Sequence, residues 1–253
     1  MTAVILAAGV ASRLRPLTDD TPKCLLKIGT QTILGRTIDN LLDNSIDRII
    51  LVTGYLEDKI RSFVQNNYPQ LQVTFIYNAD FATTNNIYSL WLAMQELSDD
   101  AMLLLDSDIL FDRLIIRLLL GSSYQNCLAL KSTHALGVEE IKVCVDGKGF
   151  ITDISKEIEP ELAIGESIGI EKFSGVGLQM LGDELERMII GRKMVDVWYE
   201  SAFQNCIQNG LRLWPVDVGD LKCMELDTIE DLQLAKAEII PYLDGKKHDP
   251  STA

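Results

Sequence analysis

The sequence predicts an α/β protein with a Rossmann-like, mostly parallel sheet flanked by helices and an inserted β-hairpin region. Two observations support this prediction. In the first half of the chain, apolar runs of strand length alternate with amphipathic helical patterns. In the second half, Asp146 and Gly147 form a turn signal between two segments with alternating apolar residues, which is typical of a hairpin. A strand–helix–strand order of this kind places helices on a parallel sheet.

The predicted elements follow one another along the chain, each with its own signal. The first helix has apolar residues at helical spacing on one face, as at Ile33, Ile38 and Leu41. The first half is expected to hold strands at 4–8, 46–52, 71–77 and 101–105, and helices near 32–44, 56–66, 86–97 and 110–120. After the hairpin at 141–155 come a strand near 164–173, helices near 175–190 and 196–209, strands near 211–218 and 222–226, and a last helix near 228–240.

Length and composition set limits on the class of protein. The 253 residues favour one domain over 1–240, with an insertion at about 130–200 and a disordered tail at 241–253. No apolar run approaches the ~20 residues of a membrane helix, so we expect no membrane partner. Five scattered cysteines without a C-x-x-C pair indicate reduced thiols in a cytoplasmic protein. A net charge of −14 argues against nucleic acid as a partner.

The N-terminal segment carries positive charge in this acidic chain. Residues 1–31 contain Arg13, Arg15, Lys23 and Lys27 against two aspartates. The strand ends in small residues, and such a loop lets backbone N–H groups converge on an anion. Its spacing fits neither the GxGxxG dinucleotide loop nor the GxxxxGK[ST] phosphate loop. From these residues alone, an anion site and an ordinary surface turn are about equally favoured.

The stretch AAGVASRLRPLT at 7–18, followed by PKCLL at 22–26, resembles the signature of the sugar-nucleotidyltransferase superfamily. The resemblance implies the nucleotidyltransferase fold, with a loop that holds a nucleoside triphosphate. By this resemblance, Arg13 and Lys23 are catalytic phosphate ligands. The loop residues implied in nucleotide binding are Ala8, Gly9 and Ser12.

Acidic residues at two positions suggest a Mg²⁺ cofactor. Asp106 and Asp108 follow a predicted central strand, and open α/β sheets bind their ligands at the carboxyl ends of such strands. Carboxylates beside phosphates suit Mg²⁺, although a solvated acidic turn is the alternative. The resemblance implies Asp108 as a catalytic metal ligand and Asp227 as a second one, and Asp106 is the weaker candidate. Asp227 with Glu230 also fits a helix N-cap with a capping box.

The segment NNIYS at 85–89 resembles the phosphocholine cytidylyltransferase branch of the superfamily. Asn85, Asn86 and Ser89 are therefore expected to bind the nucleotide, because amide and hydroxyl groups match the donors and acceptors of a cytosine edge. A structural alternative makes Asn86 the N-cap of the following helix.

The acceptor substrate is expected to bind to the insertion. The resemblance implies that Lys156 contacts the acceptor phosphate, and a surface strand end is the alternative. Carboxylates and aromatic rings near 165–174 and 195–201 suit an ammonium group on the acceptor. The expected residues are Glu171, Asp196, Trp198 and Tyr199. An amphipathic helix with buried aromatic residues is an equally weighted alternative for 195–201.

Together these features predict an enzyme that transfers CMP from CTP to a small phosphomonoester or phosphonate, such as phosphocholine, and releases pyrophosphate. Two alternatives stay open: a sugar-1-phosphate nucleotidyltransferase that uses UTP, dTTP or GTP, and a non-catalytic regulatory domain of the same fold. The expected partners are small-molecule substrates. A homodimer is an option that the sequence leaves open.

Overall fold

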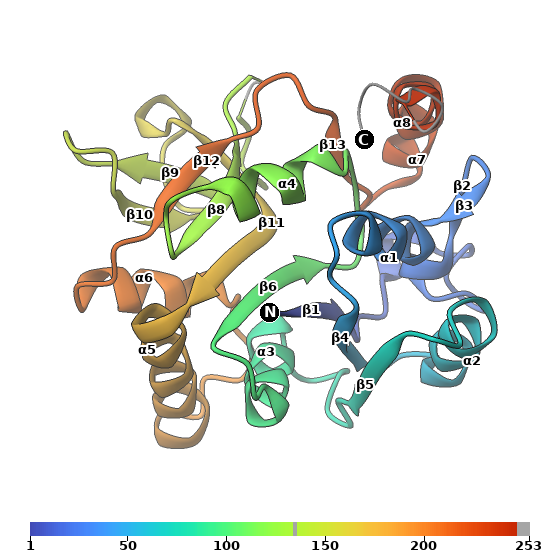
Figure 1. The fold of residues 1–253 in the computed structure, drawn as a ribbon, viewed down its shortest axis with the longest axis horizontal. Helices are drawn as coiled ribbons and strands as arrows, with labels where there is room; N and C mark the ends of the chain where they lie inside the picture. The colour runs from blue at the N-terminus through green and yellow to red at the C-terminus, as the bar shows by residue number, and fades with distance from the viewer. Residues whose placement is uncertain (134–135, 247–253) are drawn as a thin grey trace.

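Four parallel strands form the centre of the main sheet in the computed structural model, which describes residues 1–133 and 136–246. These strands are β1 (Thr2–Ala7), β4 (Arg48–Thr53), β5 (Gln72–Tyr77) and β6 (Ala101–Asp106). They lie in the order β6-β1-β4-β5 (Figure 1), and every registered pair among them is parallel, as the sequence predicts. β1 is buried along its whole length because it lies in the middle of this group.

The second half of the chain extends the sheet beyond β6 with mostly antiparallel strands. The long strand β11 (Gly165–Ser174) pairs antiparallel with β6, β8 (Cys127–Lys131) and β9 (Lys142–Val145). β9 and β10 (Ile151–Ser155) form the hairpin that the sequence predicts, and β12 (Trp214–Asp217) lies parallel to β8. Two small sheets complete the strand pairing: β2 (Lys27–Ile28) with β3 (Gln31–Thr32), and β7 (Ile109–Phe111) with β13 (Cys223–Glu225).

Helices cover both faces of the sheet, because side chains of a strand alternate between its faces. Val4 and Leu6 of β1 pack in a core with α3 (Asn86–Glu96), α5 (Gly175–Glu186) and α6 (Glu200–Gln208). Ala3 and Ile5 face the opposite core, which includes α1 (Ile33–Asp43), α2 (Glu57–Asn67) and α4 (Leu114–Gly121). Among the described residues, no helix combines the length and apolar character that crossing a membrane requires.

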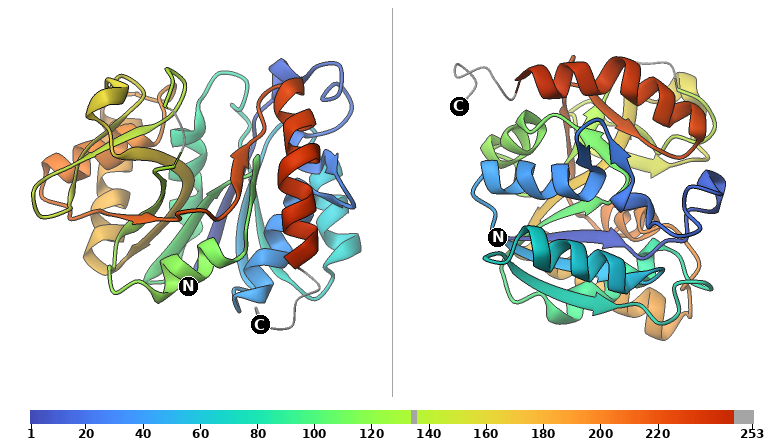
Figure 2. Two further views of the ribbon diagram at one scale, coloured as in Figure 1. Left: turned by 90° about the horizontal axis from the view of Figure 1, so that it is seen from above. Right: turned by 90° about the vertical axis from the view of Figure 1, so that its right-hand side faces the viewer.

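The C-terminal helices pack against the N-terminal loop, and this contact brings the two ends of the sequence to one site. α7 (Ile229–Leu234) continues through a π-helical segment, Ala235–Ile239, into α8 (Ile240–Lys246). Their apolar residues form a third core with Leu14 and Ile28. Figure 2 shows this red helical segment beside the blue N-terminal segments.

Three predicted boundaries are wrong. The helix predicted near 110–120 begins only at Leu114, and Ile109–Phe111 forms the strand β7 instead. The last helix ends at Lys246 and not near 240, so residues 241–246 of the predicted disordered tail are helical. Leu243 is buried against the third core and Arg36 forms an ion pair with Asp244 at 2.8 Å, which outweighs the helix-breaking tendency of Pro241. Residues 247–253 lie outside the described part of the chain. The helix predicted at 196–209 begins only at Glu200.

Candidate active site

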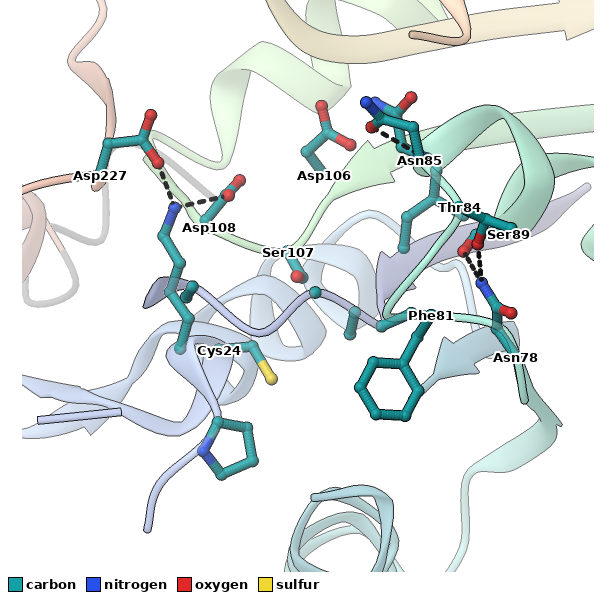
Figure 3. Close-up of a pocket in the computed structure, with 18 of the residues that line it drawn as sticks. Cys24, Asn78, Phe81, Thr84, Asn85, Ser89, Asp106, Ser107, Asp108 and Asp227 are labelled. Carbon is teal, nitrogen blue, oxygen red and sulfur yellow. Dashed lines mark hydrogen bonds and ion pairs between the residues drawn. The ribbon is translucent and has the colours of Figure 1, made fainter. Parts of the chain in front are cut away.

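A pocket of about 300 Å³ lies at the carboxyl ends of β1 and β6 (Figure 3), where parallel sheets bind ligands. Most of the residues predicted from the sequence line this pocket: Ala8, Gly9, Arg13, Lys23, Asn85, Asn86, Ser89, Asp106, Asp108, Trp198 and Asp227. The predicted residues Ser12, Lys156, Glu171, Asp196 and Tyr199 are not part of its lining. Asn78 and Glu225 line the pocket although the sequence analysis did not select them.

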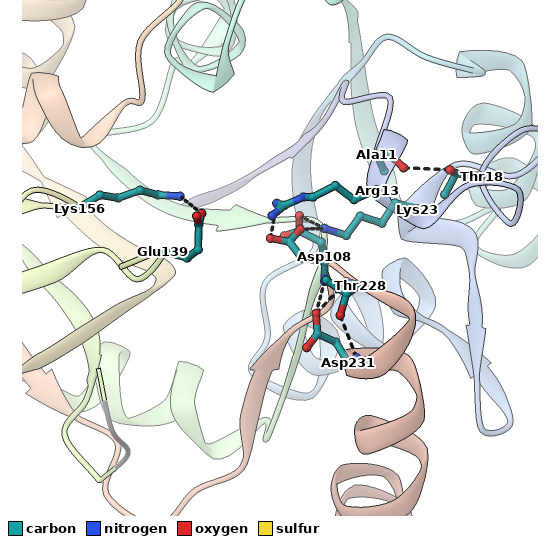
Figure 4. Close-up of polar contacts among 10 residues, drawn as sticks. Ala11, Arg13, Thr18, Lys23, Asp108, Glu139, Lys156, Thr228 and Asp231 are labelled. Atoms are coloured by element: carbon teal, nitrogen blue, oxygen red, sulfur yellow. Dashed lines mark hydrogen bonds and ion pairs between the residues drawn. The ribbon is translucent and has the colours of Figure 1, made fainter. Parts of the chain in front are cut away.

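The loop after β1 is held in a fixed shape that aims Arg13 at the pocket. Ala11 adopts the left-handed conformation, with φ of 51°, and the Thr18 hydroxyl donates a hydrogen bond to its carbonyl at 2.9 Å. A single 3₁₀ turn, Ser12–Leu14, follows, and the buried Leu14 anchors it in the third core. Because the loop is anchored on both sides of Arg13, the guanidinium extends toward Asp108 and Asp227 (Figure 4).

Lys23 lies between two of the predicted metal ligands. Its ammonium is 2.7 Å from Asp108 Oδ2 and 2.6 Å from Asp227 Oδ1, and Arg13 binds the other Asp227 oxygen. Burial alone would lower the pKa of Lys23, but the negative charges of Asp108 and Asp227 outweigh it and raise the pKa. Burial would raise the pKa of Asp227, but Lys23 and Arg13 hold it below its usual value. The ammonium is therefore charged at any working pH.

The carboxylates of Asp108, Glu225 and Asp227 come within 4.8 Å of one another. Burial and the charges of the two aspartates raise the pKa of Glu225 to about 8. Asp108 Oδ1 is buried without a hydrogen-bond donor among the described residues. Three convergent carboxylates with an unsatisfied oxygen suit a hard divalent cation, so the residues present fit the predicted Mg²⁺.

Glu225 and Asp227 are positioned by different elements. β13 pairs with β7, and this register places Glu225 opposite Ile109, next to Asp108 in sequence. The side chain that caps α7 is Thr228, which forms a capping box with Asp231. The alternative of Asp227 as the N-cap is therefore wrong, and its carboxylate is free to bind Lys23 and Arg13.

The predicted nucleotide-binding asparagines also hold the pocket wall together. Asn85, and not Asn86, is the N-cap of α3, and its side chain accepts a hydrogen bond from the Asn86 N–H. The Asn86 side-chain oxygen accepts the Tyr199 N–H at 2.9 Å. The buried Asn78 amide donates to Ser89 Oγ at 3.1 Å. These bonds fix the loop before α3 and the segment before α6 as one wall.

A second group of acidic residues combines one that lines the pocket, Asp106, with two buried ones, Glu171 and Glu200, and we call it the acid cluster. Tyr199 is fully buried, so its ring presents no open face to a ligand. Its hydroxyl donates a hydrogen bond to Asp106 Oδ2 at 2.9 Å. Burial and neighbouring carboxylates raise the pKa of Asp106 and of Glu171. Gly169 has φ of +70°, and a Cβ there would lie 2.6 Å from Asp106 Oδ2, so glycine makes room for this carboxylate.

Lys156 and Trp198 contact each other at the edge of the pocket. The Lys156 ammonium lies 4.7 Å from the Trp198 ring centre and 3.4 Å from Glu139 Oε2. Figure 4 shows Lys156 on the side of the site opposite Arg13 and Lys23. Asp196 is exposed. Of the predicted acceptor residues, the structure therefore brings Lys156 and Trp198 together but leaves Asp196 apart.

Comparison with known proteins places the chain in a family. Residues 3–139 match the model of the MobA-like NTP transferase domain. The chain is 26% identical to the CMP-5'-(3-aminopropyl)phosphonate synthase of Streptomyces rubellomurinus over 249 residues, which cover 94% of this chain and 39% of that protein. It is 36% identical to the choline-phosphate cytidylyltransferase of Streptococcus pneumoniae over 99 residues, which cover 39% of this chain and 42% of that one. The aligned residues thus cover less than half the length of either relative.

The fold is also found among solved structures. The CTP:phosphocholine cytidylyltransferase of Streptococcus pneumoniae superimposes with a TM-score of 0.76 and 20% identity, covering 94% of this chain and 98% of the other. This likeness confirms the predicted fold class, a mixed α/β fold with a mostly parallel central sheet. The matched family model spans the loop after β1, Lys23 and Asp108. The chain belongs to the family of MobA-like NTP transferase domains.

Proposed function

We propose that the protein is a Mg²⁺-dependent cytidylyltransferase that transfers CMP from CTP to a small phosphomonoester or phosphonate and releases pyrophosphate. The observation that carries this proposal is the convergence of Arg13 and Lys23 with Asp108 and Asp227 at one edge of the sheet. Two relatives are named for cytidylyl transfer or for a CMP-linked product, which favours CTP over other nucleotides. A regulatory domain without catalysis would have no need of this ionic arrangement.

The reaction needs positioning and charge neutralisation more than proton transfer. The acceptor phosphate is already an anion, so its oxygen can attack the α-phosphorus of CTP without a base. Arg13 and Lys23 would bind the triphosphate and stabilise the negative charge that develops on the leaving pyrophosphate. A divalent cation held by Asp108, Glu225 and Asp227 would supply further neutralisation of the phosphates.

The two substrates would contact different elements around the pocket. Asn85 and Ser89 line the side near α3 and offer amide and hydroxyl groups to a cytosine edge. The segment 130–200 would bind the acceptor, and Lys156 would align its phosphate. Lys156 lies on Trp198 at the pocket edge, and this position supports that role.

Nucleotide selectivity tests the proposal. We expect kcat/KM for CTP to exceed that for UTP, dTTP and GTP by at least about tenfold, which corresponds to about 1.4 kcal/mol and to one or two base-edge hydrogen bonds. The measurement is pyrophosphate release with each nucleotide and a panel of phosphomonoesters, phosphonates and sugar 1-phosphates. Equal turnover with UTP or dTTP, or a preference for a sugar 1-phosphate, would contradict the cytidylyltransferase assignment.

A further inference from the structure

A group of polar side chains lies in the pocket away from the residues that would bind phosphate. Three members of the pocket lining form this group: Asn78, Thr84 and Ser89. Figure 3 shows them apart from Asp108 and Asp227. The cationic side chains that would hold the triphosphate are bound to those two aspartates. Under the proposed function, the base of the nucleotide therefore lies against the polar group.

The amide of Asn78 has a fixed orientation. Asn78 directly follows β5, its backbone N–H donates to the Thr53 carbonyl at 2.8 Å, and its exposed fraction is only 1%. The backbone N–H of Asp80 donates to Asn78 Oδ1 at 2.9 Å. A backbone N–H cannot accept a hydrogen bond, so the amide oxygen has to face Asp80. The NH₂ group of Asn78 consequently points to the other side, where the two hydroxyls lie.

This NH₂ group binds both hydroxyls and leaves them in different states. It donates to Thr84 Oγ1 at 3.2 Å and to Ser89 Oγ at 3.1 Å. The Thr84 hydroxyl donates its own hydrogen to the Asp80 carbonyl at 2.9 Å. Among the described residues, the Ser89 hydroxyl takes part only in the bond that it accepts from Asn78. Its hydrogen is therefore available to a ligand in the pocket.

The bond from Asn78 decides how the Ser89 hydroxyl can pair with a base. A serine hydroxyl on its own rotates either to donate or to accept, so it would not distinguish two bases. If a base N–H pointed at Ser89, the oxygen would accept two N–H bonds and its own hydrogen would have no acceptor. Ser89 is 3% exposed, and a buried polar group without a partner is costly. The hydroxyl thus favours a base that offers a hydrogen-bond acceptor.

We propose that Asn78 is a positioning residue for nucleotide selection: it makes the Ser89 hydroxyl a hydrogen-bond donor to N3 of the base. N3 is an acceptor in cytosine, whereas in uracil it carries a hydrogen and is a donor. The pair of Asn78 and Ser89 therefore accepts CTP and rejects UTP. The inference rests on the proposed function and adds the residues that select its nucleotide.

Asn78→Asp tests the proposal because it replaces the NH₂ group by an oxygen of similar size. The carboxylate still accepts the Asp80 N–H, but it also accepts the Ser89 hydrogen, so that Ser89 turns a lone pair toward the base. Calorimetry with Mg²⁺ and CTP or UTP, at about pH 8 so that the carboxyl is ionised, gives both dissociation constants without an acceptor. We expect the ratio of UTP to CTP dissociation constants to fall at least about tenfold. An unchanged ratio would overturn the proposal.

A nucleotide analogue tests the same bond in the unaltered protein and so does not depend on the folding of a variant. In 3-deaza-CTP a C–H group replaces N3, which removes the acceptor and keeps the rest of the base edge. We expect it to bind at least about tenfold more weakly than CTP. In Ser89→Ala the two nucleotides should bind about equally, because the donor is missing. Equal binding of CTP and 3-deaza-CTP by the unaltered protein would overturn the proposal.

Thr84→Val is the matched control for Asn78→Asp. Valine keeps the shape of the threonine side chain and removes the other oxygen that the Asn78 amide binds. We expect the ratio of UTP to CTP dissociation constants to stay within about twofold of that of the unaltered protein. A ratio that falls as far as in Asn78→Asp would show that packing of the loop sets the selectivity, and it would overturn the role of the Ser89 hydrogen.

Failure of the proposed function gives a different result from failure of this inference. If the protein binds CTP more tightly than UTP but releases no pyrophosphate with any phosphomonoester or phosphonate, the transfer reaction is wrong, and the binding ratios still judge the selection by Asn78. A preference for CTP that survives both Asn78→Asp and the loss of N3 overturns the inference alone. An unaltered protein that binds CTP and UTP equally contradicts both.

Discussion

Replacing Asp108 by asparagine is expected to lower kcat on the order of 10²-fold or more, because preorganised charge at the reacting phosphates is usually a leading catalytic term. Asparagine keeps the size of the side chain but removes the charge that faces Lys23 and the neighbouring carboxylates. The fold should survive, since Asp108 lies in the turn after β6. Steady-state kinetics at several Mg²⁺ concentrations, with circular dichroism as a check of folding, measures this effect.

Asp106→Asn is the informative comparison for this variant. Asp106 is two residues away and also lines the pocket, but it lies outside the group formed by Asp108, Glu225 and Asp227. We therefore expect Asp106→Asn to change KM for the acceptor and to leave the Mg²⁺ dependence of kcat near that of the unaltered protein. Near-normal activity in Asp108→Asn, together with lost Mg²⁺ dependence in Asp106→Asn, would contradict the assignment of Asp108 as the metal ligand and favour Asp106.

Lys23→Met is expected to have a large effect on both catalysis and stability. Without the ammonium, Asp108, Glu225 and Asp227 repel one another, and a nearly buried ion pair loses its positive partner. Removing one partner of a fully buried ion pair lowers the free energy of unfolding by about 3–5 kcal/mol. Because these carboxylates are partly exposed, we expect Lys23→Met to lower it by about 2–3 kcal/mol. Loss of a phosphate ligand should also lower kcat on the order of 10²-fold.

Added MgCl₂ separates the two roles of Lys23. A cation that binds the folded state raises the free energy of unfolding, and in Lys23→Met it no longer competes with the ammonium for Asp108 and Asp227. We expect Mg²⁺ to raise the melting temperature of the variant more than that of the unaltered protein, without restoring kcat. Lys27→Met, at an exposed lysine on β2, is the control and should behave like the unaltered protein. An unchanged melting temperature in Lys23→Met would contradict the account of the ion cluster.

The sequence predicts the parts of the site that lie near strand ends and in a recognisable motif. Arg13, Lys23 and Asp108 lie after buried strands in the first half of the chain. Local signals left a ligand site and an ordinary turn both open there, and the resemblance to a family assigned these three residues. Their convergence with Asp227 depends on the packing of α7 and α8 against Leu14 and Ile28. That contact joins segments about 200 residues apart, so only the resemblance to a family could suggest it.

Other residues were beyond local reasoning because tertiary packing decides their environment. Glu225 stands two positions before Asp227 in a short strand, and this spacing was its only signal; the pairing of β13 with β7 brings it to Asp108. Glu200 belongs to the group of carboxylates near 195–201, and its burial at the start of α6 depends on tertiary packing. Tyr199 and Trp198 are adjacent in sequence, but one is buried against Asp106 and the other is exposed beneath Lys156.

The most direct test of the central claim is identification of the product by phosphorus NMR after incubation of the protein with CTP, Mg²⁺ and phosphoethanolamine. The account predicts two new coupled resonances of a CDP-linked diphosphate, formed in equal amount to pyrophosphate, and their absence in Asp108→Asn at the same time point. CTP that stays intact, while UTP and a sugar 1-phosphate are converted to a nucleotide sugar, would contradict it.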